Sequence, residues 1–136
     1  REMSERDAVL FANEAFYRAF ADRDARAMDA MWSTNAPVTC IHPGWGPIQD
    51  REEVVASWAA ILADENAPDI QCQDAEAQIY GDVAVVICFE TIDDGRLIAT
   101  NIFCREGPIW KMIHHQAGPT SAAPDPHTAE TGGALH

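Results

Sequence analysis

Four strand-like stretches separated by turn signals fill the second half of the chain, and this pattern constrains the fold most. The stretches are IQCQDAEAQIY, VAVVICFETI, LIATNIFCRE and IWKMIHHQA. Turn-forming residues follow them in order: Gly81-Asp82, Asp93-Asp94-Gly95, Gly107-Pro108 and Gly118-Pro119. Glycine, aspartate and proline between runs rich in β-branched residues are typical of tight hairpin turns. We therefore expect four consecutive strands that pair as an antiparallel meander.

The first half of the chain predicts three amphipathic helices and one short strand. Three residues suited to capping a helix N-terminus precede the helical stretches: Ser4, Asp24 and Asp50. The first helix carries an apolar stripe that includes Val9, Phe16 and Phe20 at helical spacing. Between the second and third helices, residues 38–41 read as a strand that Pro43 ends.

Together these elements predict an α+β fold. Three N-terminal helices must bury their apolar stripes on one face of a mainly antiparallel β-sheet. Because antiparallel sheets coil, we expect the sheet to curl around the helices as a cone and to leave a cavity between the layers. Residues 1–118 then form a single domain. Residues 119–136, which are rich in Pro, Ala, Thr and Gly, are expected to be a flexible tail.

Charge and composition exclude several partners. Nine basic against 22 acidic residues give a formal net charge of −13, which repels nucleic acid and anionic membrane surfaces. We find no apolar stretch of about 18 residues that would predict a membrane helix. The four cysteines form no C-x-x-C pair, so we expect reduced thiols in a cytoplasmic protein. Metal-ligand spacings and phosphate-binding loops are missing too, and we expect no metal and no cofactor.

The order and spacing of these elements resemble the NTF2-like superfamily, specifically its SnoaL-like branch. The resemblance runs from about residue 5 to residue 118 and is carried by ANEAFYRAFADRD, MDAMW, CIHPGW, GDVAVVICFE, ATNIFCRE and IWKMIHHQA. It implies the cone-shaped fold and a homodimer formed through the outer face of the sheet. Members of this superfamily include ketosteroid isomerase, scytalone dehydratase, polyketide cyclases, small-molecule binders and oligomeric hub domains. The resemblance therefore transfers a pocket, but no catalytic residue.

Strand alternation divides the side chains of the meander between two faces. With two-residue turns, Asn101 lies opposite His114. One face then mixes polar and large apolar side chains: Glu90, Asn101, Arg105, Trp110, Met112, His114 and Gln116. The other is more apolar: Val85, Ile87, Phe89, Ile98, Thr100, Ile102, Ile113 and His115. We expect the apolar face to meet the helices and the mixed face to form the dimer surface. Ala77 joins the mixed face after a two-residue Gly81-Asp82 turn and the apolar face after a three-residue turn.

His42 and His115 are the first candidates for acid–base chemistry. His42 ends the short strand at the expected mouth of the cavity, where an imidazole can exchange a proton near pH 7. His115 points inward in this assignment, and burial would hold it neutral. Each histidine also has a structural interpretation: His42 as a hydrogen-bonding residue at a strand end, and His115 as a satisfied core residue.

Glu90 and four aromatic residues complete the candidate site. Glu90 is an interfacial or solvated carboxylate in the expected face assignment, and a buried general base if that assignment is reversed. The aromatic candidates for binding a ligand are Tyr17, Trp32, Trp45 and Trp58. Trp32 and Trp58 lie on the apolar stripes of their helices, which also fits a purely structural role in the core.

Two functions remain open at the level of sequence. The first is a pocket protein for a small apolar carbonyl compound, with isomerisation, cyclisation or dehydration by cofactor-free proton transfer. His115 or Glu90 would then be the base, and His42 or Tyr17 would polarise the carbonyl. The second is a dimeric accessory, ligand-binding or hub module without turnover. The sequence leaves open whether the chain is an enzyme, and the identity of the ligand.

Overall fold

The structure, a computed structural model, describes residues 3–125 of the chain. Its helices and strands are α1 (Glu5–Ala21), α2 (Ala25–Met31), β1 (Thr39–Ile41), α3 (Arg51–Ala63), β2 (Gln71–Tyr80), β3 (Val83–Ile92), β4 (Gly95–Glu106) and β5 (Ile109–Pro119). The α+β element order expected from the sequence is confirmed. Most of the expected tail, residues 126–136, lies outside the described residues.

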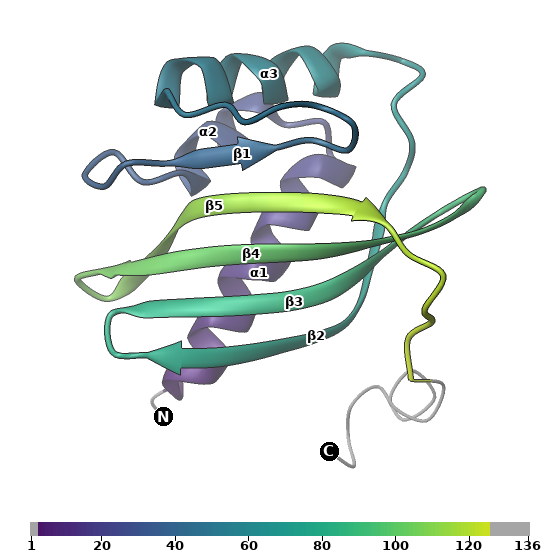
Figure 1. Cartoon of the computed structure of the whole chain (residues 1–136). Coiled ribbons are helices and arrows are strands. Elements are labelled where there is room, and N and C mark those ends of the chain that lie inside the picture. Colours follow the sequence, from purple (N-terminus) through teal and green to yellow (C-terminus); the bar gives the residue numbers. More distant parts are fainter. Residues whose placement is uncertain (1–2, 126–136) are drawn as a thin grey trace.

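The five strands form one open sheet in the order β1-β5-β4-β3-β2. β2 to β5 pair as the expected antiparallel meander, and β1 adds to the edge of β5 in parallel. Figure 1 shows α1 crossing one face of the sheet while α2 and α3 lie beside the β1 edge. Among residues 3–125, no helix lies on the opposite face of the sheet.

Side-chain caps fix where the three helices begin, as the sequence predicts. The hydroxyl of Ser4 accepts from the Asp7 amide, and the carboxylates of Asp24 and Asp50 accept from amides three residues further on. Each cap satisfies one of the four amide groups that a helix N-terminus leaves without a partner. The capping residues thus mark the position at which each helix begins.

The turns set the strand register. Gly81-Asp82 is a two-residue turn, because Tyr80 pairs with Val83, and Ala77 consequently lies opposite Val86. In the next hairpin Ile92 pairs with Gly95, so the turn residues are Asp93 and Asp94 rather than Asp94 and Gly95. A turn at Asp94-Gly95 would place Glu90 opposite Ala99, whereas Glu90 pairs with Leu97. This shift of two residues does not move any side chain to the other face of its strand.

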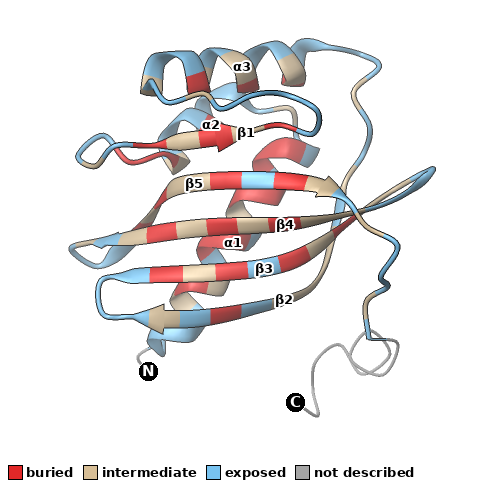
Figure 2. Cartoon of the chain, in the orientation of Figure 1, coloured by how far each residue is buried: buried red, intermediate tan, exposed pale blue. Residues whose placement is uncertain are grey.

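The assignment of the two sheet faces was wrong. The residues buried under α1 are Ala84, Val86, Cys88 and Glu90 on β3 and Ala99, Asn101 and Phe103 on β4. Val85, Ile87 and Phe89 point to the uncovered face instead. Burial alternates along both strands, as Figure 2 shows for β3 and β4. The buried face includes small residues such as Ala84 and Ala99, so apolar bulk was a poor guide to the buried side.

An irregularity in β5 changes which of its side chains face the helices. Phe103 pairs with Met112, but the preceding residue of β4, Ile102, pairs with His114. One residue, Ile113, is therefore extra on β5, which is the definition of a β-bulge. Asn101 lies opposite His115 instead of the expected His114. Met112 and His115 are both buried as a result, and His115 points inward as expected, although by a different register.

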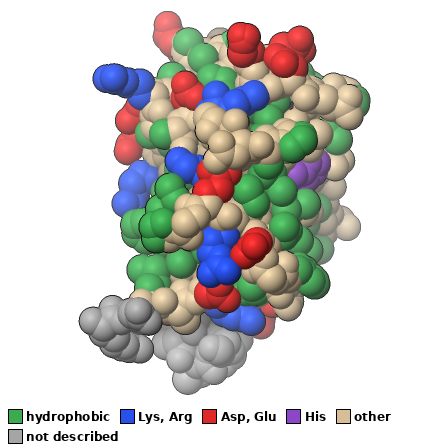
Figure 3. All heavy atoms as spheres, turned by 90° about the vertical axis from the view of Figure 1, so that its left-hand side faces the viewer, with side chains coloured by type: hydrophobic (Ala, Val, Ile, Leu, Met, Phe, Trp, Pro, Cys, Tyr) green, Lys and Arg blue, Asp and Glu red, His purple; other side chains and the backbone are tan. Residues whose placement is uncertain are grey.

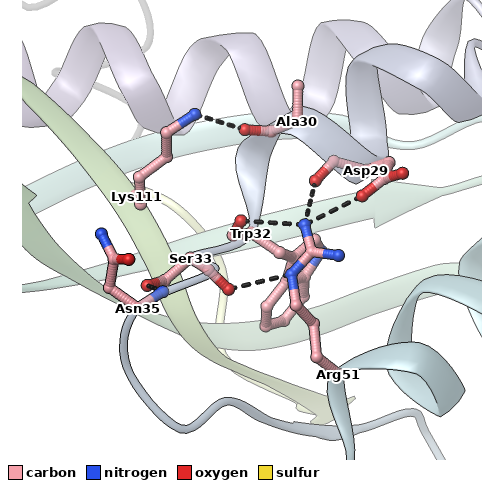
Figure 4. Close-up of polar contacts among 7 residues, drawn as sticks. All are labelled: Asp29, Ala30, Trp32, Ser33, Asn35, Arg51 and Lys111. Atoms are coloured by element: carbon pink, nitrogen blue, oxygen red, sulfur yellow. Dashed lines mark hydrogen bonds and ion pairs between the residues drawn. The ribbon is translucent and has the colours of Figure 1, made fainter.

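Arg51, at the start of α3, joins this helix to the C-terminal end of α2 and the residues that follow it (Figure 4). Its guanidinium donates to the backbone carbonyls of Asp29, Trp32 and Ser33 at 2.9, 3.1 and 2.9 Å. It also pairs with the Asp29 carboxylate at 2.9 Å. Lys111 of β5 donates to the carbonyl of Ala30 at 2.6 Å. These cations donate hydrogen bonds to carbonyls at and just beyond the C-terminus of α2, where the Asp29 carbonyl also accepts from the Trp32 amide.

We expect the Arg51→Ala variant to lose about 2 kcal/mol of unfolding free energy, because hydrogen bonds to a charged group are worth about 1.5–3 kcal/mol. Urea denaturation measures this loss. The control is Arg18→Ala, which removes an exposed pair with Glu14 within α1 and should cost about 0.3 kcal/mol. Equal losses in both variants would contradict a structural role for the Arg51 contacts.

Candidate functional site

A cavity of about 330 Å³ opens between α1, α3 and the concave face of the sheet. Its lining is mainly aromatic and aliphatic, with a few polar groups: Phe16, Tyr17, Phe20, His42, Pro43, Trp45, Trp58, Ile61, Asp64, Asn66, Ala67, Pro68, Ile70, Glu90, Leu97 and His115. Asp64 and Asn66 are exposed and lie at the rim. An apolar hollow with few convergent polar groups is the usual form of a small-molecule site.

Tyr17 and Glu90 form a buried pair at the inner end of the cavity. The Tyr17 hydroxyl donates to Oε2 of Glu90 at 2.5 Å. Glu90 comes from β3 and is only 2% exposed. A carboxyl group buried among apolar side chains needs such a partner, since an unpaired one would carry a large desolvation cost. The second carboxyl oxygen, Oε1, makes no hydrogen bond to the described residues, and Glu90 is one of the residues that line the cavity.

Asn101 connects this pair to His115. Its side-chain amide nitrogen donates to the Tyr17 hydroxyl at 3.1 Å and to Oδ1 of Asn13 at 2.8 Å. Its Oδ1 lies 2.6 Å from Nδ1 of His115. The network thus runs from Glu90 through Tyr17 and Asn101 to His115, and every side chain in it is buried.

His42 lies on the other side of the cavity, directly after β1. Its Nε2 is 2.9 Å from the Ser57 hydroxyl of α3. The imidazole packs edge-on between two indoles, with ring centroids 4.8 Å from Trp45 and 4.7 Å from Trp58. Trp45 itself is 53% exposed, so this aromatic group forms the outer wall of the cavity.

Burial shifts the pKa values of the ionisable groups in the site. It lowers the pKa of His42 to about 4, and the pKa of His115 to about 3 with smaller contributions from the charges of His42 and His114. Both imidazoles are therefore neutral at pH 7. Burial raises the pKa of Glu90, which the hydrogen bond from Tyr17 opposes. The pKa of Tyr17 is also well above its ordinary value, chiefly through burial.

The structure brings six of the seven candidate residues to one cavity: Tyr17, His42, Trp45, Trp58, Glu90 and His115. Trp32 is the exception. It is buried in the core, where Met112 is its bridge partner, and it does not line this cavity. The structural interpretation of Trp32 therefore fits its position. Glu90 occupies the buried position that the reversed face assignment implies.

Sequence reasoning missed the two asparagines of the network. Asn13 lies four residues after Val9 and four before Tyr17, on the apolar stripe of α1. Asn101 alternates with Ala99 and Phe103 on the buried face of β4. A polar amide within an apolar pattern on two different elements was the available signal, since buried amides require partners.

Within residues 3–125, no group of three or more His, Cys, Asp or Glu side chains is arranged to hold a metal ion. No helix in that part of the chain is long and apolar enough to cross a membrane.

Three helices together with one open, curled five-stranded sheet define the NTF2-like fold. A crystal structure described as a putative dehydratase of the NTF2-like family from Streptomyces avermitilis superposes with a TM-score of 0.78 at 30% identity, covering 87% of this chain and 97% of that one. The model of the SnoaL-like domain matches residues 9–121. The chain therefore belongs to the SnoaL-like domain family.

Two further relatives are described as proteins of other kinds, an association domain and an F-box protein. A putative calcium/calmodulin-dependent protein kinase type II association domain from Thiobacillus denitrificans is 31% identical, with a TM-score of 0.67, covering 81% of this chain and 93% of that one. The F-box protein SKIP8 of Arabidopsis thaliana is 29% identical over 112 residues. That match covers 81% of this chain and 48% of the plant protein, so the chain spans about half the length of this curated relative.

We expect the two neutral histidines to make stability depend on pH. Because the pKa of His115 is about 3 in the folded protein and about 6.5 when unfolded, the unfolded chain binds an extra proton between these values. Stability is therefore lost as pH falls through this window. Between pH 7 and pH 5, the unfolding free energy of the His115→Gln variant should fall by about 2 kcal/mol less than that of the wild type.

Urea denaturation at both pH values measures this difference. The comparison between variant and wild type isolates His115, since the remaining groups titrate in both proteins. Gln116→Ala, a change at the exposed neighbour, is the control and should follow the wild type. An unchanged pH dependence in His115→Gln would contradict a neutral buried imidazole.

Proposed function

We propose that the chain binds a small, largely apolar carbonyl compound in this cavity and transfers a proton without a cofactor, in an isomerisation, cyclisation or dehydration. The observation that carries the proposal is the position of Glu90. Its carboxyl group is buried, held in place by Tyr17, and borders a cavity with aromatic walls. A site of this kind orients a ring compound against a group that can exchange a proton.

Among the candidate bases, the pKa shifts favour Glu90 over the histidines. A general base works best when its pKa lies near the working pH. Burial moves the pKa of Glu90 upward towards neutrality and moves that of His115 to about 3. His115 and His42 are therefore better suited to contact the ligand than to remove a proton. Tyr17 orients the carboxyl group, because its single hydroxyl hydrogen is donated to Glu90.

The relative from Streptomyces avermitilis supports this class of reaction. It is described as a putative dehydratase and is 30% identical over nearly its whole length. Dehydration requires a group that takes a proton from carbon and a group that returns one to the departing hydroxyl. A buried carboxyl group can serve both steps in turn.

We expect the wild type to catalyse exchange of the α-protons of 2-tetralone in D2O, followed by NMR, because this bicyclic ketone tests proton removal without the natural substrate. Glu90→Gln keeps the shape of the side chain but cannot take a proton, so the exchange rate should fall about 10²–10⁴-fold.

Glu76→Gln is the matched control, since this carboxylate is exposed on β2 outside the cavity. It should exchange at the wild-type rate. Equal rates for Glu90→Gln and wild type, or no catalysed exchange by the wild type, would contradict the proposal.

A second candidate function, a dimeric accessory or hub module, is favoured by the uncovered sheet face. Apolar side chains of β3 remain accessible there, with Val83 36% and Ile87 49% exposed. In Figure 3, where this face lies at the right, hydrophobic side chains gather beside a histidine. Surfaces of this kind commonly mark interfaces. The relative from Thiobacillus denitrificans, described as an association domain, supports assembly through a second copy of the chain.

If this face forms a homodimer, Ile87→Lys should weaken the dimer at least tenfold, because the interface would then bury an unpaired ammonium group. Sedimentation velocity over a range of concentrations measures the change. Phe11→Lys places the same charge on an exposed residue of α1 and should leave the dimer unchanged. A wild type that stays monomeric, or equal effects of both variants, would contradict this interface.

We also propose that the protein works in a reducing compartment such as the cytoplasm, as a single domain over residues 1–118. The four free cysteines, two of them buried, support the first point. The continuous core that joins α1 to the sheet supports the second.

A further inference from the structure

The charges around the cavity limit which ligands it can hold. Asp64 and Glu90 supply carboxyl groups, and no Lys or Arg occurs among the described lining residues. The two histidines are buried and neutral at pH 7. A carboxylate or phosphate ligand would therefore leave water without gaining a counter-charge, which is costly in an apolar site.

The hydrogen bonds of Asn101 decide which nitrogen of His115 carries the proton. Because the amide nitrogen of Asn101 donates to Asn13 and Tyr17, its Oδ1 is the atom that accepts. Nδ1 of His115, 2.6 Å away, must then be the donor. A neutral imidazole protonated at Nδ1 has its lone pair on Nε2. Since Asn101 does not line the cavity and His115 does, we place Nε2 on the side of the ring that borders it.

The same reasoning applies to His42. The Ser57 hydroxyl has one hydrogen, which it donates to the Val54 carbonyl at 2.7 Å. Nε2 of His42 lies 2.9 Å from the Ser57 oxygen and 3.8 Å from the Cys40 thiol. With the Ser57 hydrogen on the Val54 carbonyl, we assign Nε2 as the donor to Ser57. The lone pair of this neutral imidazole is consequently on Nδ1. Both histidines thus reach the cavity with an acceptor nitrogen that no described protein donor uses.

Tyr17 and Trp58 do not offset this excess of acceptors. The Tyr17 hydroxyl gives its hydrogen to Glu90 and also accepts from Asn101, so it has no hydrogen left for a ligand. The indole nitrogen of Trp58 is fully buried and has no hydrogen-bond partner among the described residues, so it presents no accessible donor to a ligand. Oε1 of Glu90 adds a further acceptor whenever the carboxyl group is ionised.

From these contacts we infer that the ligand is an uncharged ring compound bearing hydroxyl groups, which donate hydrogen bonds to His115, His42 and Glu90. The aromatic walls and the 330 Å³ volume accommodate one or two fused rings. The inference rests on the proposed function, in that it concerns the same cavity, and it narrows the substrate to a hydroxylated carbonyl compound. It also fits dehydration better than isomerisation, since dehydration needs a hydroxyl group held beside an acid–base residue.

The test compares three probes of nearly equal shape by isothermal titration calorimetry at pH 7: 2-naphthol, 2-methoxynaphthalene and 2-naphthoate. We expect 2-naphthol to bind about 5–10-fold more tightly than the methyl ether, because one net hydrogen bond is worth about 1–1.4 kcal/mol. The naphthoate should bind most weakly. Binding of the ether or the acid as tight as that of 2-naphthol, or no binding of 2-naphthol below 1 mM, would overturn the inference.

Paired histidine variants locate the effect. His115→Phe should reduce the preference for 2-naphthol over its ether, whereas His114→Phe should keep it, since His114 bonds to Thr39 and does not line the cavity. The preference of the wild type for 2-naphthol over its ether is measured without any variant. It therefore tests the inference even if His115→Phe fails to fold. This result is also independent of the exchange assay. If Glu90→Gln exchanges protons at the wild-type rate while the wild type still prefers 2-naphthol, the proposed reaction is wrong and the inferred ligand class is retained.

Discussion

The extra residue in β5 is the constraint on which the arrangement of the site depends. On β5, Met112 is buried before Ile113 and His115 is buried after it. The alternation of buried and outward side chains therefore shifts by one residue at the bulge, while β5 stays paired with β4 on both sides. A regular strand would bring His114 opposite Asn101 and turn His115 to the uncovered face. The bulge therefore lets one strand fill the core beneath α2 at one end and supply an imidazole to the cavity at the other.

A buried polar network within an apolar core follows from this placement. Asn101 satisfies three neighbours at once, namely Asn13, Tyr17 and His115. Such networks are favourable only when all members are paired, since a buried group without a partner costs about 1–3 kcal/mol. Here the network serves both layers: it joins α1 to the sheet and fixes the orientation of the groups that border the cavity.

The sequence predicted the elements of this fold well and their faces poorly. Capping residues such as Asp50 and the two-residue turn at Gly81-Asp82 act locally, so their effects can be read from a few neighbouring residues. Which face is buried depends instead on where the helices pack, and the buried positions of β3 and β4 include small residues such as Ala84 and Ala99. Large apolar residues remain on the uncovered face, and comparing hydrophobicity therefore pointed to the wrong side.

The candidate site was accessible to sequence reasoning only in part. His42 and Trp45 could be placed because they follow a strand end in an unusual local context. The role of Glu90 depended on the face assignment, and that of Asn101 on a bulge that no local signal marks. Contacts such as the one between Tyr17 and Glu90 join residues 73 positions apart, and only the folded chain brings them together.

The walls of the cavity belong to separate stretches of the chain, and this division has a consequence for how ligand preference can change. The outer wall around Trp45 and the rim near Asn66 are loops whose side chains make few of the contacts that hold the core. Substitutions there can reshape the opening while Asn101 and its partners stay as they are. A fold arranged in this way separates the residues that set what enters from those that set what happens inside, so new specificities need not disturb the scaffold.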